Sequence, residues 1–327
     1  MSSEEQPEYQ IPPELQPGSD DVAYDLDTAL DAIVSIRAEI PEDAFTASIL
    51  GTERAGHGIL INDTGLIVTI GYLVTEAQSI WVVTRKGQAV AGHLVGYDYE
   101  TGFGLVQALG RLEVQAMPLA ESDALEVGDE MVVAGCGGKG DSLKVRLAAR
   151  QEFAGYWEYV LDEALFTTPP HPNWGGAALI DADGCLAGVG SLFIDQIQSE
   201  FGSLEGNMMV PIDLLKPIME ELMMYGRTMK PARPWLGMFV SEVESNFMIA
   251  GVYNDAPAAQ AGLQAGDVVI ELDGEKPADL AAFFRVMWSV GPAGSEIPLT
   301  VERDNETLHF KVPSVDRRDF WKAPELH

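Results

Sequence analysis

Short runs of β-branched and other apolar residues, separated by turn signals, occupy residues 45–210. Within residues 58–69, two such runs flank an Asn-Asp-Thr-Gly turn and predict a hairpin. Further strands are predicted at residues 79–84, 93–97, 104–109, 130–134, 144–149, 165–168, 177–180 and 185–189. Many short strands with no long helix between them are typical of an all-β barrel or sandwich.

Helical periodicity replaces the strand pattern at residues 211–225, where apolar residues follow a proline that fits a first helical turn. A second helix is predicted at residues 279–289, within a further set of strands. Residues 1–36 hold nine acidic residues, no Lys or Arg, and several prolines that break regular structure, although residues 23–40 also fit a short helix or edge segment. The chain is therefore expected to comprise an acidic flexible tail at 1–36, a first domain at 37–225, a linker at 226–232, a second domain at 233–313 and a polar tail at 314–327.

The composition excludes several classes of function. The 327 residues include 51 Asp and Glu but 20 Lys and Arg, so the formal net charge is −31. This charge repels phosphate backbones and anionic lipids, and no basic patch in the sequence offsets it. Neither a nucleic acid nor a membrane is therefore an expected partner. The length fits two domains, and 46% hydrophobic residues can supply a core for each.

The sequence also bears on compartment and cofactors. It has neither a run of about 18 apolar residues nor a secretory leader, so we expect a cytoplasmic protein. Cys136 and Cys185 have the spacing of neither a disulfide framework nor a zinc site. No metal and no cofactor are therefore expected.

Four segments occur in an order that resembles the HtrA (Deg) serine proteases. They are Gly56-His-Gly58 entering the first hairpin, Val95-Gly-Tyr-Asp98, residues 172–184, and residues 207–213 leading to Arg233-Pro-Trp-Leu-Gly-Met238. Residues 254–274, which contain Ala-Gly-Leu-Gln-Ala-Gly-Asp, resemble a PDZ domain. The resemblance covers about residues 52–312 and implies a mainly β chain, a trypsin-like double β-barrel followed by a PDZ domain. It also implies a trimer assembled through the barrels.

The positions that carry the catalytic triad in the resembled family are substituted. A serine protease needs a nucleophilic hydroxyl, an imidazole that takes its proton and a carboxylate that orients the imidazole. The motifs place Tyr72 at the histidine, Gly102 at the aspartate and Gly175 at the serine. Sliding the last match by one residue puts Trp174 at the serine instead. Neither residue has a nucleophilic atom, so the resemblance implies a pseudoprotease with no catalytic residue.

Other histidines and cysteines offer alternative bases and nucleophiles. His57, His93 and His171 are expected on the surface or in loops rather than as bases. Cys136 lies in a glycine-rich loop beside a lysine that favours a thiolate, but the corresponding family segment is a structural loop. Cys185 follows a turn at the start of a strand and is expected to be a small core residue.

The PDZ-like segment retains the residues of a peptide groove. PDZ domains add an extended chain terminus beside a strand and hold its carboxylate on the backbone N–H groups of a glycine-containing loop. The missing side chain of Gly237 lets a carboxylate approach such a loop. The expected peptide-binding residues are Trp235, Leu236, Gly237 and Met238 in the loop, and Leu280, Phe284 and Met287 on one face of the predicted helix. These apolar walls indicate protein or peptide C-termini with apolar end residues as ligands.

Three functions remain open at this point. The favoured hypothesis is a catalytically inactive HtrA-like adaptor or scaffold that binds peptides or protein subunits through its PDZ domain. The first alternative is a structural subunit of a multiprotein enzyme complex, with the PDZ groove occupied by its own tail or by a partner. The second alternative is a hydrolase with a nucleophile that the family does not use.

Overall fold

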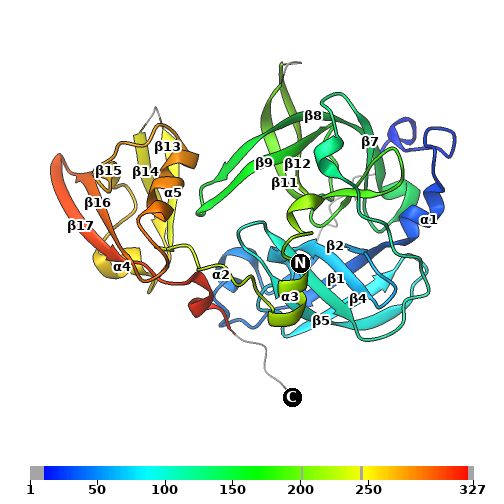
Figure 1. Ribbon diagram of the computed structural model, residues 1–327, viewed down its shortest axis with the longest axis horizontal. Helices are drawn as coiled ribbons and strands as arrows, with labels where there is room; N and C mark the ends of the chain where they lie inside the picture. The colour runs from blue at the N-terminus through cyan, green and yellow to red at the C-terminus, as the bar shows by residue number, and fades with distance from the viewer. Residues whose placement is uncertain (1–10, 200–201, 244–245, 323–327) are drawn as a thin grey trace, which may run out of the picture. The chain divides into compact units, whose positions relative to one another are not determined.

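The computed structural model describes residues 11–199, 202–243 and 246–322 (Figure 1). The described chain forms two compact units. The first holds the residues up to Gln151, Glu163–Thr228 and Lys322, and the second holds Glu152–Asp162 and Met229–Trp321. The boundary after Thr228 lies within the expected linker. The assignment of residues 152–162 to the second unit was not anticipated from the sequence.

The first unit contains two closed β-barrels. In order around the first barrel, the strands are β1 (Ile33–Glu39), β2 (Glu53–Leu60), β3 (Leu66–Ile70), β6 (Phe103–Ala108), β5 (Ala89–Tyr97) and β4 (Ser79–Thr84). The predicted hairpin joins β2 to β3, with Ile59 opposite Val68. Its turn is held by Asn62, whose side-chain oxygen accepts from the N–H of Leu66 at 2.9 Å. This local hydrogen bonding is typical of asparagine in turns.

The second barrel follows the same plan. Its strands, in order, are β10 (Ala178–Ile180), β11 (Leu186–Ser199), β12 (Gly202–Pro211), β9 (Tyr159–Thr168), β8 (Ser142–Gly155) and β7 (Glu130–Ala134). Apolar side chains such as Leu147, Leu165 and Leu179 fill its interior and are fully buried. The strands β8 and β9 run from this barrel into residues 152–162, which belong to the second unit. After β12, the turn η5 (Ile212–Leu214) and the helix α3 (Met219–Tyr225) take the place of the single predicted helix.

The second unit is a five-stranded sheet with two short helices (Figure 1). The strands, in order, are β13 (Met238–Val243), β14 (Asn246–Val252), β15 (Val268–Leu272), β16 (Glu296–Arg303) and β17 (Glu306–Pro313), and the helices are α4 (Pro257–Ala261) and α5 (Leu280–Ser289). Asp279 caps α5 by accepting from the N–H of Ala282 at 2.7 Å. The expected fold class, a mainly β chain with a trypsin-like double barrel and a PDZ domain, is confirmed.

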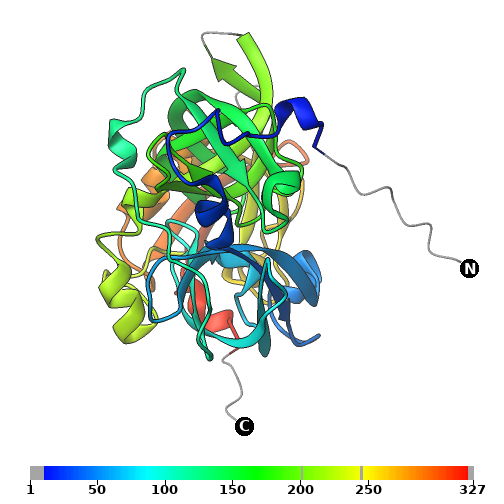
Figure 2. The same ribbon diagram turned by 90° about the vertical axis from the view of Figure 1, so that its right-hand side faces the viewer.

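The short helix or edge segment expected within residues 23–40 is confirmed by a helix at Leu26–Asp31 and by β1. The expected flexible tail at residues 1–36 is wrong for residues 11–36, which are ordered. They include η1 (Pro13–Leu15) and α1 (Leu26–Asp31), and α1 lies beside β1 and η4 (Gly138–Asp141) (Figure 2). Ile11, Leu30 and Ile33 are buried, so their apolar burial outweighs the acidic composition of the segment. Residues 1–10 lie outside the described part of the chain.

The expected polar tail at residues 314–327 is also ordered as far as residue 322. Val315 pairs with Trp235 in a β-bridge, and η6 (Arg317–Phe320) follows. The ring centroid of Phe320 lies 5.1 Å from that of Trp235, so the Phe320 side chain packs within the second unit. Residues 323–327 lie outside the described chain. Within the described residues, no helix has the length and apolar character needed to cross a membrane.

Candidate functional site

Tyr72, Gly102 and Gly175, which the resemblance places at the triad positions, lie together in the first unit. A Cβ atom on Gly175 would lie 3.2 Å from the hydroxyl oxygen of Tyr72. Gly71, which precedes Tyr72, donates its N–H to the carbonyl oxygen of Gly102 at 2.7 Å. The structure therefore brings Tyr72, Gly102 and Gly175 to one place, as their order in the resembled motifs predicts.

Tyr72 is held as a neutral phenol at this position. Its hydroxyl donates to the carbonyl oxygen of Ser191 at 2.9 Å. Burial raises the pKa of Tyr72 well above its usual range, because the phenolate would lose its solvation. The hydroxyl is committed to a backbone acceptor and retains its proton, so it cannot take a proton from a nucleophile.

The loop that would carry the nucleophile is fixed by backbone contacts. Gly175 accepts from the N–H of His57 at 2.9 Å. Gly176 has a φ of 76°, and a Cβ atom there would lie 2.0 Å from the carbonyl oxygen of His57. The half-buried Trp174 packs its ring 5.8 Å from that of Phe193. The loop thus requires glycine at residue 176 and anchors its tryptophan on β11.

Two buried histidines hold this loop in place. His171 lies in a loop, as expected, but His57 lies on β2, which corrects the expectation of a surface or loop residue there. His57 is 7% exposed and His171 is fully buried, whereas His93 is exposed as expected. The Nδ1 atom of His57 accepts from the N–H of Cys136 at 3.1 Å, and that of His171 accepts from the N–H of Asn173 at 3.1 Å. Burial lowers the pKa of both histidines, so both are neutral structural groups at pH 7.

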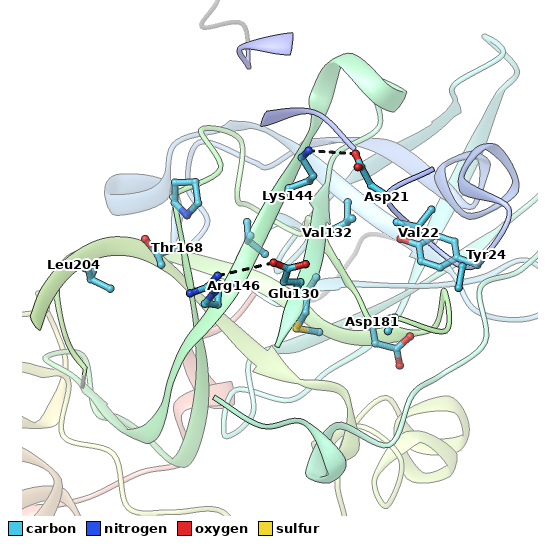
Figure 3. Close-up of a pocket in the computed structure, with 15 residues that line it drawn as sticks. Asp21, Val22, Tyr24, Glu130, Val132, Lys144, Arg146, Thr168, Asp181 and Leu204 are labelled. Atoms are coloured by element: carbon cyan, nitrogen blue, oxygen red, sulfur yellow. Dashed lines mark hydrogen bonds and ion pairs between the residues drawn. The ribbon is translucent and has the colours of Figure 1, made fainter. Parts of the chain in front are cut away.

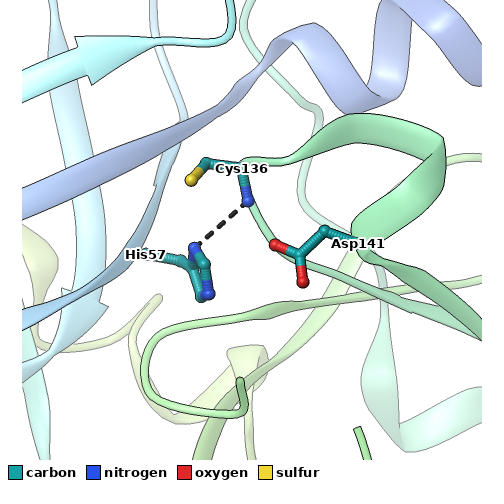
Figure 4. Close-up of side chains that lie close together, drawn as sticks. All are labelled: His57, Cys136 and Asp141. Carbon is teal, nitrogen blue, oxygen red and sulfur yellow. Dashed lines mark hydrogen bonds between the residues drawn. The ribbon is translucent and has the colours of Figure 1, made fainter. Parts of the chain in front are cut away.

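His57, Cys136 and Asp141 form a compact cluster around this anchor (Figure 4). Each contributes a potential metal-ligand atom, and the atoms lie within 4.8 Å of one another. The Nδ1 atom of His57 is already engaged by a backbone N–H. Burial raises the pKa of the Cys136 thiol, contrary to the thiolate that the nearby lysine would favour. Since metal binding and nucleophilic attack both need the thiolate, the cluster favours neither.

A separate cavity of about 850 Å³ lies in the first unit (Figure 3). Residues of the N-terminal segment and of the second barrel line it. The cations at its wall are paired: Lys144 lies 3.2 Å from Asp21, and Arg146 lies 3.9 Å from Glu130. These pairs make the cavity a poor receptor for an anionic ligand.

The predicted carboxylate-binding loop of the second unit holds a carboxylate of the chain itself. The N–H groups of Leu236, Gly237 and Met238 point to Oε1 of Glu158 at 3.3, 2.9 and 3.2 Å. Glu158 is 5% exposed and lies between β8 and β9, at a φ of 62°. Three converging backbone donors are the arrangement that PDZ domains use for a terminal carboxylate.

Gly237 is the residue that makes the loop possible. It has a φ of 74°, in the left-handed region, and a Cβ atom there would lie 2.4 Å from Cβ of Ala256. Only glycine adopts this backbone without strain and without that overlap. From the sequence, Gly237 is expected only to let a carboxylate approach the loop. The structure adds a steric requirement from Ala256.

The residues beside Glu158 continue along the groove. Val240 on β13 donates its N–H to the carbonyl oxygen of Tyr156 at 2.9 Å. The ring of Tyr156 lies 5.8 Å from that of Phe239. Val160 is 7% exposed and packs within the apolar core of the second unit. Residues 156–160 therefore occupy the edge of β13, the carboxylate loop and an apolar site at the same time.

The remaining predicted groove residues are placed as follows. Phe284 and Met287 are fully buried in the same core, and Leu280 is half-buried against it. Trp235 is buried, with its ring 5.7 Å from that of Tyr253. The structure thus brings the loop and the helix face to one core, in which these side chains pack. Their role in binding a peptide stays a prediction.

Electrostatics distinguish Glu158 from an ordinary surface carboxylate. Burial raises its pKa to about 7, although the charge of Arg317 and the backbone N–H groups oppose the shift. On α5, Arg285 pairs with both Glu152 and Asp162, the latter at 2.5 Å. Sequence reasoning missed Glu158 and Arg285, because no local motif marks either residue as a partner of the groove.

Two family models match this chain. Residues 56–189 match the trypsin-like peptidase domain, and residues 234–313 match the PDZ domain. The chain is 26% identical over 276 residues to the periplasmic serine endoprotease DegP of Escherichia coli. This match covers 79% of this chain and 56% of DegP. The chain is also 26% identical over 294 residues to the serine protease Do-like HtrA of Lactobacillus helveticus, covering 80% and 69% of the two chains.

The two domains, in this order, and the relatives named DegP and HtrA support an HtrA-family protein. The chain spans 56% of the length of the DegP proteins that it matches. Solved structures agree on the fold. The HtrA-type protease AlgW with tripeptide has a TM-score of 0.51 at 23% identity, covering 89% of this chain and 95% of AlgW. The serine endoprotease from Yersinia pestis has a TM-score of 0.51 at 20% identity, covering 90% and 99%.

Proposed function

We propose that this HtrA-family chain is a catalytically inactive adaptor that binds the C-termini of other proteins through its PDZ loop. The observation that carries the proposal is the convergence of the N–H groups of Leu236, Gly237 and Met238 on one carboxylate. A loop that holds the carboxylate of Glu158 has the donors that a chain terminus needs. The peptide-bound AlgW structures support the assignment by analogy of fold.

The proposed loss of catalysis rests on the substituted triad. Gly175 has no side chain, Gly102 has no carboxylate, and the hydroxyl of Tyr72 is bonded to Ser191. Without a base, the proton of an attacking hydroxyl has no acceptor at this site. The relatives are named as endoproteases, so the proposal sets this chain apart from them by residues rather than by fold.

One observation favours the alternative of a hydrolase with a non-family nucleophile. Cys136 and His57 lie in one cluster, and cysteine–histidine pairs are a known nucleophilic arrangement. Two features oppose this function: the Nδ1 atom of His57 accepts from a backbone N–H, and burial raises the pKa of the thiol. A fluorophosphonate probe, an iodoacetamide probe and casein hydrolysis test both nucleophile types, with Escherichia coli DegP as the active control. Serine-dependent labelling, or casein cleavage that Cys136→Ala abolishes, would overturn the proposed inactivity.

Carboxylate recognition is tested with a fluorescein-labelled decapeptide that ends in Leu-Val. We expect the free acid to bind at least about tenfold more tightly than its C-terminal amide, because hydrogen bonds to a charged acceptor contribute about 1.5–3 kcal/mol. Gly237→Asp places a carboxylate in the loop and is expected to abolish binding. If acid and amide bind alike and Gly237→Asp matches the wild type, the groove is not a recognition site and a structural subunit is the better reading.

A further inference from the structure

We propose that residues 152–162 are a built-in ligand of the PDZ groove, which an incoming C-terminus must displace. This inference rests on the proposed function, because it assumes that the groove binds carboxylate-ended peptides. Below, residues 152–162 are called the plug. The plug makes the groove a competitive site with a closed resting state, rather than an open receptor.

The plug matches a peptide ligand in three independent respects. The Glu158 carboxyl group accepts hydrogen bonds from the N–H groups of the loop, and the Tyr156 carbonyl oxygen accepts one from the N–H of Val240. Val160 supplies an apolar side chain to the core of the unit. A residue that merely packed nearby would share one of these features, whereas a ligand needs all three.

The contacts of the plug with the loop and with β13 also follow one direction along the chain. Glu158 contacts the N–H of Met238, and Tyr156, two residues earlier, contacts Val240, two residues later. The carboxyl group thus sits at the loop while the chain before it runs beside β13, which is the direction that a bound C-terminus takes. The turn at residues 156–158 is joined to the edge of β13 by one backbone hydrogen bond, from Val240 to Tyr156. This turn bends the chain back after Glu158, where a true ligand would end.

The contacts that hold the plug can be replaced by water or by a ligand. Arg285 on α5 pairs with Glu152 and Asp162, one on each side of the turn. The side chains of Arg285 and Glu152 are about four-tenths exposed, and that of Asp162 is almost fully exposed, so salt weakens both pairs. Glu158 is the buried contact, and its carboxyl group accepts from the same N–H groups that a terminal carboxylate would use.

Competition of this kind sets the properties of the partner. An intramolecular ligand acts at an effective concentration of about millimolar. The apparent affinity for a free peptide is therefore lowered in proportion to the fraction of molecules whose groove is open. The incoming terminus must offer a carboxylate to the loop and an apolar side chain in place of Val160. It also gains Arg285 once the plug leaves, which favours an acidic residue within the same peptide.

The test uses the full chain and the Leu-Val decapeptide, measured by fluorescence anisotropy. Glu158→Ala removes the competing carboxylate and is expected to raise the apparent affinity at least about tenfold. Glu130→Ala, which removes an exposed carboxylate of β7, is the matched control and should bind as the wild type does. A Glu158→Ala protein that binds no more tightly than wild type overturns the plug.

A second variant covers the case in which Glu158→Ala fails to fold. Tyr156→Cys with Phe239→Cys introduces two thiols on adjacent segments, because the N–H of Val240 donates to the carbonyl oxygen of Tyr156 at 2.9 Å. A disulfide there should lock the plug and abolish peptide binding, and reduction should restore it in the same sample. Unchanged binding by the oxidised protein would show that the groove opens without moving the plug.

The same measurements separate the two proposals. If the free acid binds better than the amide in every variant, but neither Glu158→Ala nor the disulfide changes affinity, the carboxylate receptor stands and the plug fails. If acid and amide bind alike even in Glu158→Ala and in the reduced double variant, the receptor and the plug both fail.

Discussion

Oε1 of Glu158 accepts a hydrogen bond from the N–H of Gly237 at 2.9 Å, between residues 79 positions apart in the sequence. The contact joins a turn of the peptidase-like segment to the loop that recognises carboxylates in PDZ domains. It places a carboxyl group of the chain itself at the position that the proposed function assigns to the terminal carboxylate of a partner.

The first prediction concerns Gly237. Gly237→Ala is expected to lower the free energy of unfolding of the second unit by about 2–3 kcal/mol, through left-handed strain and overlap with Ala256. Gly266→Ala is the control, since Gly266 also has a positive φ, 96°, but has open space around its Cβ position. Urea unfolding should show the larger loss for Gly237→Ala. Equal losses would mean that overlap with Ala256 contributes nothing.

The second prediction concerns pH. Docked Glu158 keeps its proton up to about pH 7, whereas a released side chain ionises near 4.5. Docking is therefore strongest below pH 4.5 and weakens as pH rises to 7, by a total on the order of 3 kcal/mol. The charge of Arg317 opposes the shift, and burial raises the pKa of the neighbouring Tyr253, so the Tyr253 hydroxyl keeps its proton in this range.

Peptide titrations at several pH values check this dependence. The apparent affinity of the wild type for the Leu-Val decapeptide should rise between pH 5 and pH 7.5 and then level off. Glu158→Gln cannot ionise, so its affinity should change less over the same range. A wild-type profile that is flat, or that matches Glu158→Gln, contradicts the role assigned to this carboxyl group.

The third prediction concerns the buried histidine of the first unit. His57→Ala removes the acceptor for the N–H of Cys136 and is expected to cost about 1–3 kcal/mol of unfolding free energy. His93→Ala, at an exposed position on β5, should change stability by less than about 0.5 kcal/mol. Thermal unfolding of the two variants gives the comparison. Equal midpoints would show that His57 is not an anchor.

The fourth prediction concerns the former nucleophile position. Gly175→Ser crowds the Tyr72 hydroxyl, because a Cβ atom would lie 3.2 Å from it, and should cost about 1–3 kcal/mol. In a Tyr72→Phe background the same substitution should cost about 1 kcal/mol less, a coupling that a double-mutant cycle measures. Gly140→Ser, at a position with open space, is the control. Additive effects would mean that the two positions do not touch.

Much of the fold could be predicted because its signals are local. The turn at Asn62 and the glycine at residue 237 impose conformations that their own residue types require, and both are found in the structure. The acidic segment before residue 37 was misjudged for the opposite reason. Its composition describes the average residue, whereas its order depends on a few apolar side chains, such as Leu30 and Ile33, that are buried.

The candidate site was predicted in part. The loop at residues 235–238 follows from its motif, but Glu158 could not be recognised as its occupant. A glutamate in a turn carries no local sign of a partner 78 to 80 residues away. His57 was misassigned for a related reason. A histidine can be buried when distant backbone groups form hydrogen bonds with its ring nitrogens, and the sequence does not reveal those hydrogen bonds.

The plug also makes the second unit discontinuous, since it draws one segment from within the peptidase-like sequence. A fragment cut to begin at residue 229 would keep every strand from β13 to β17 and still lack Val160 and Glu158. Such an excised module would expose apolar surface that the intact chain covers. It would also bind the C-termini of other proteins with a higher affinity than the intact chain does.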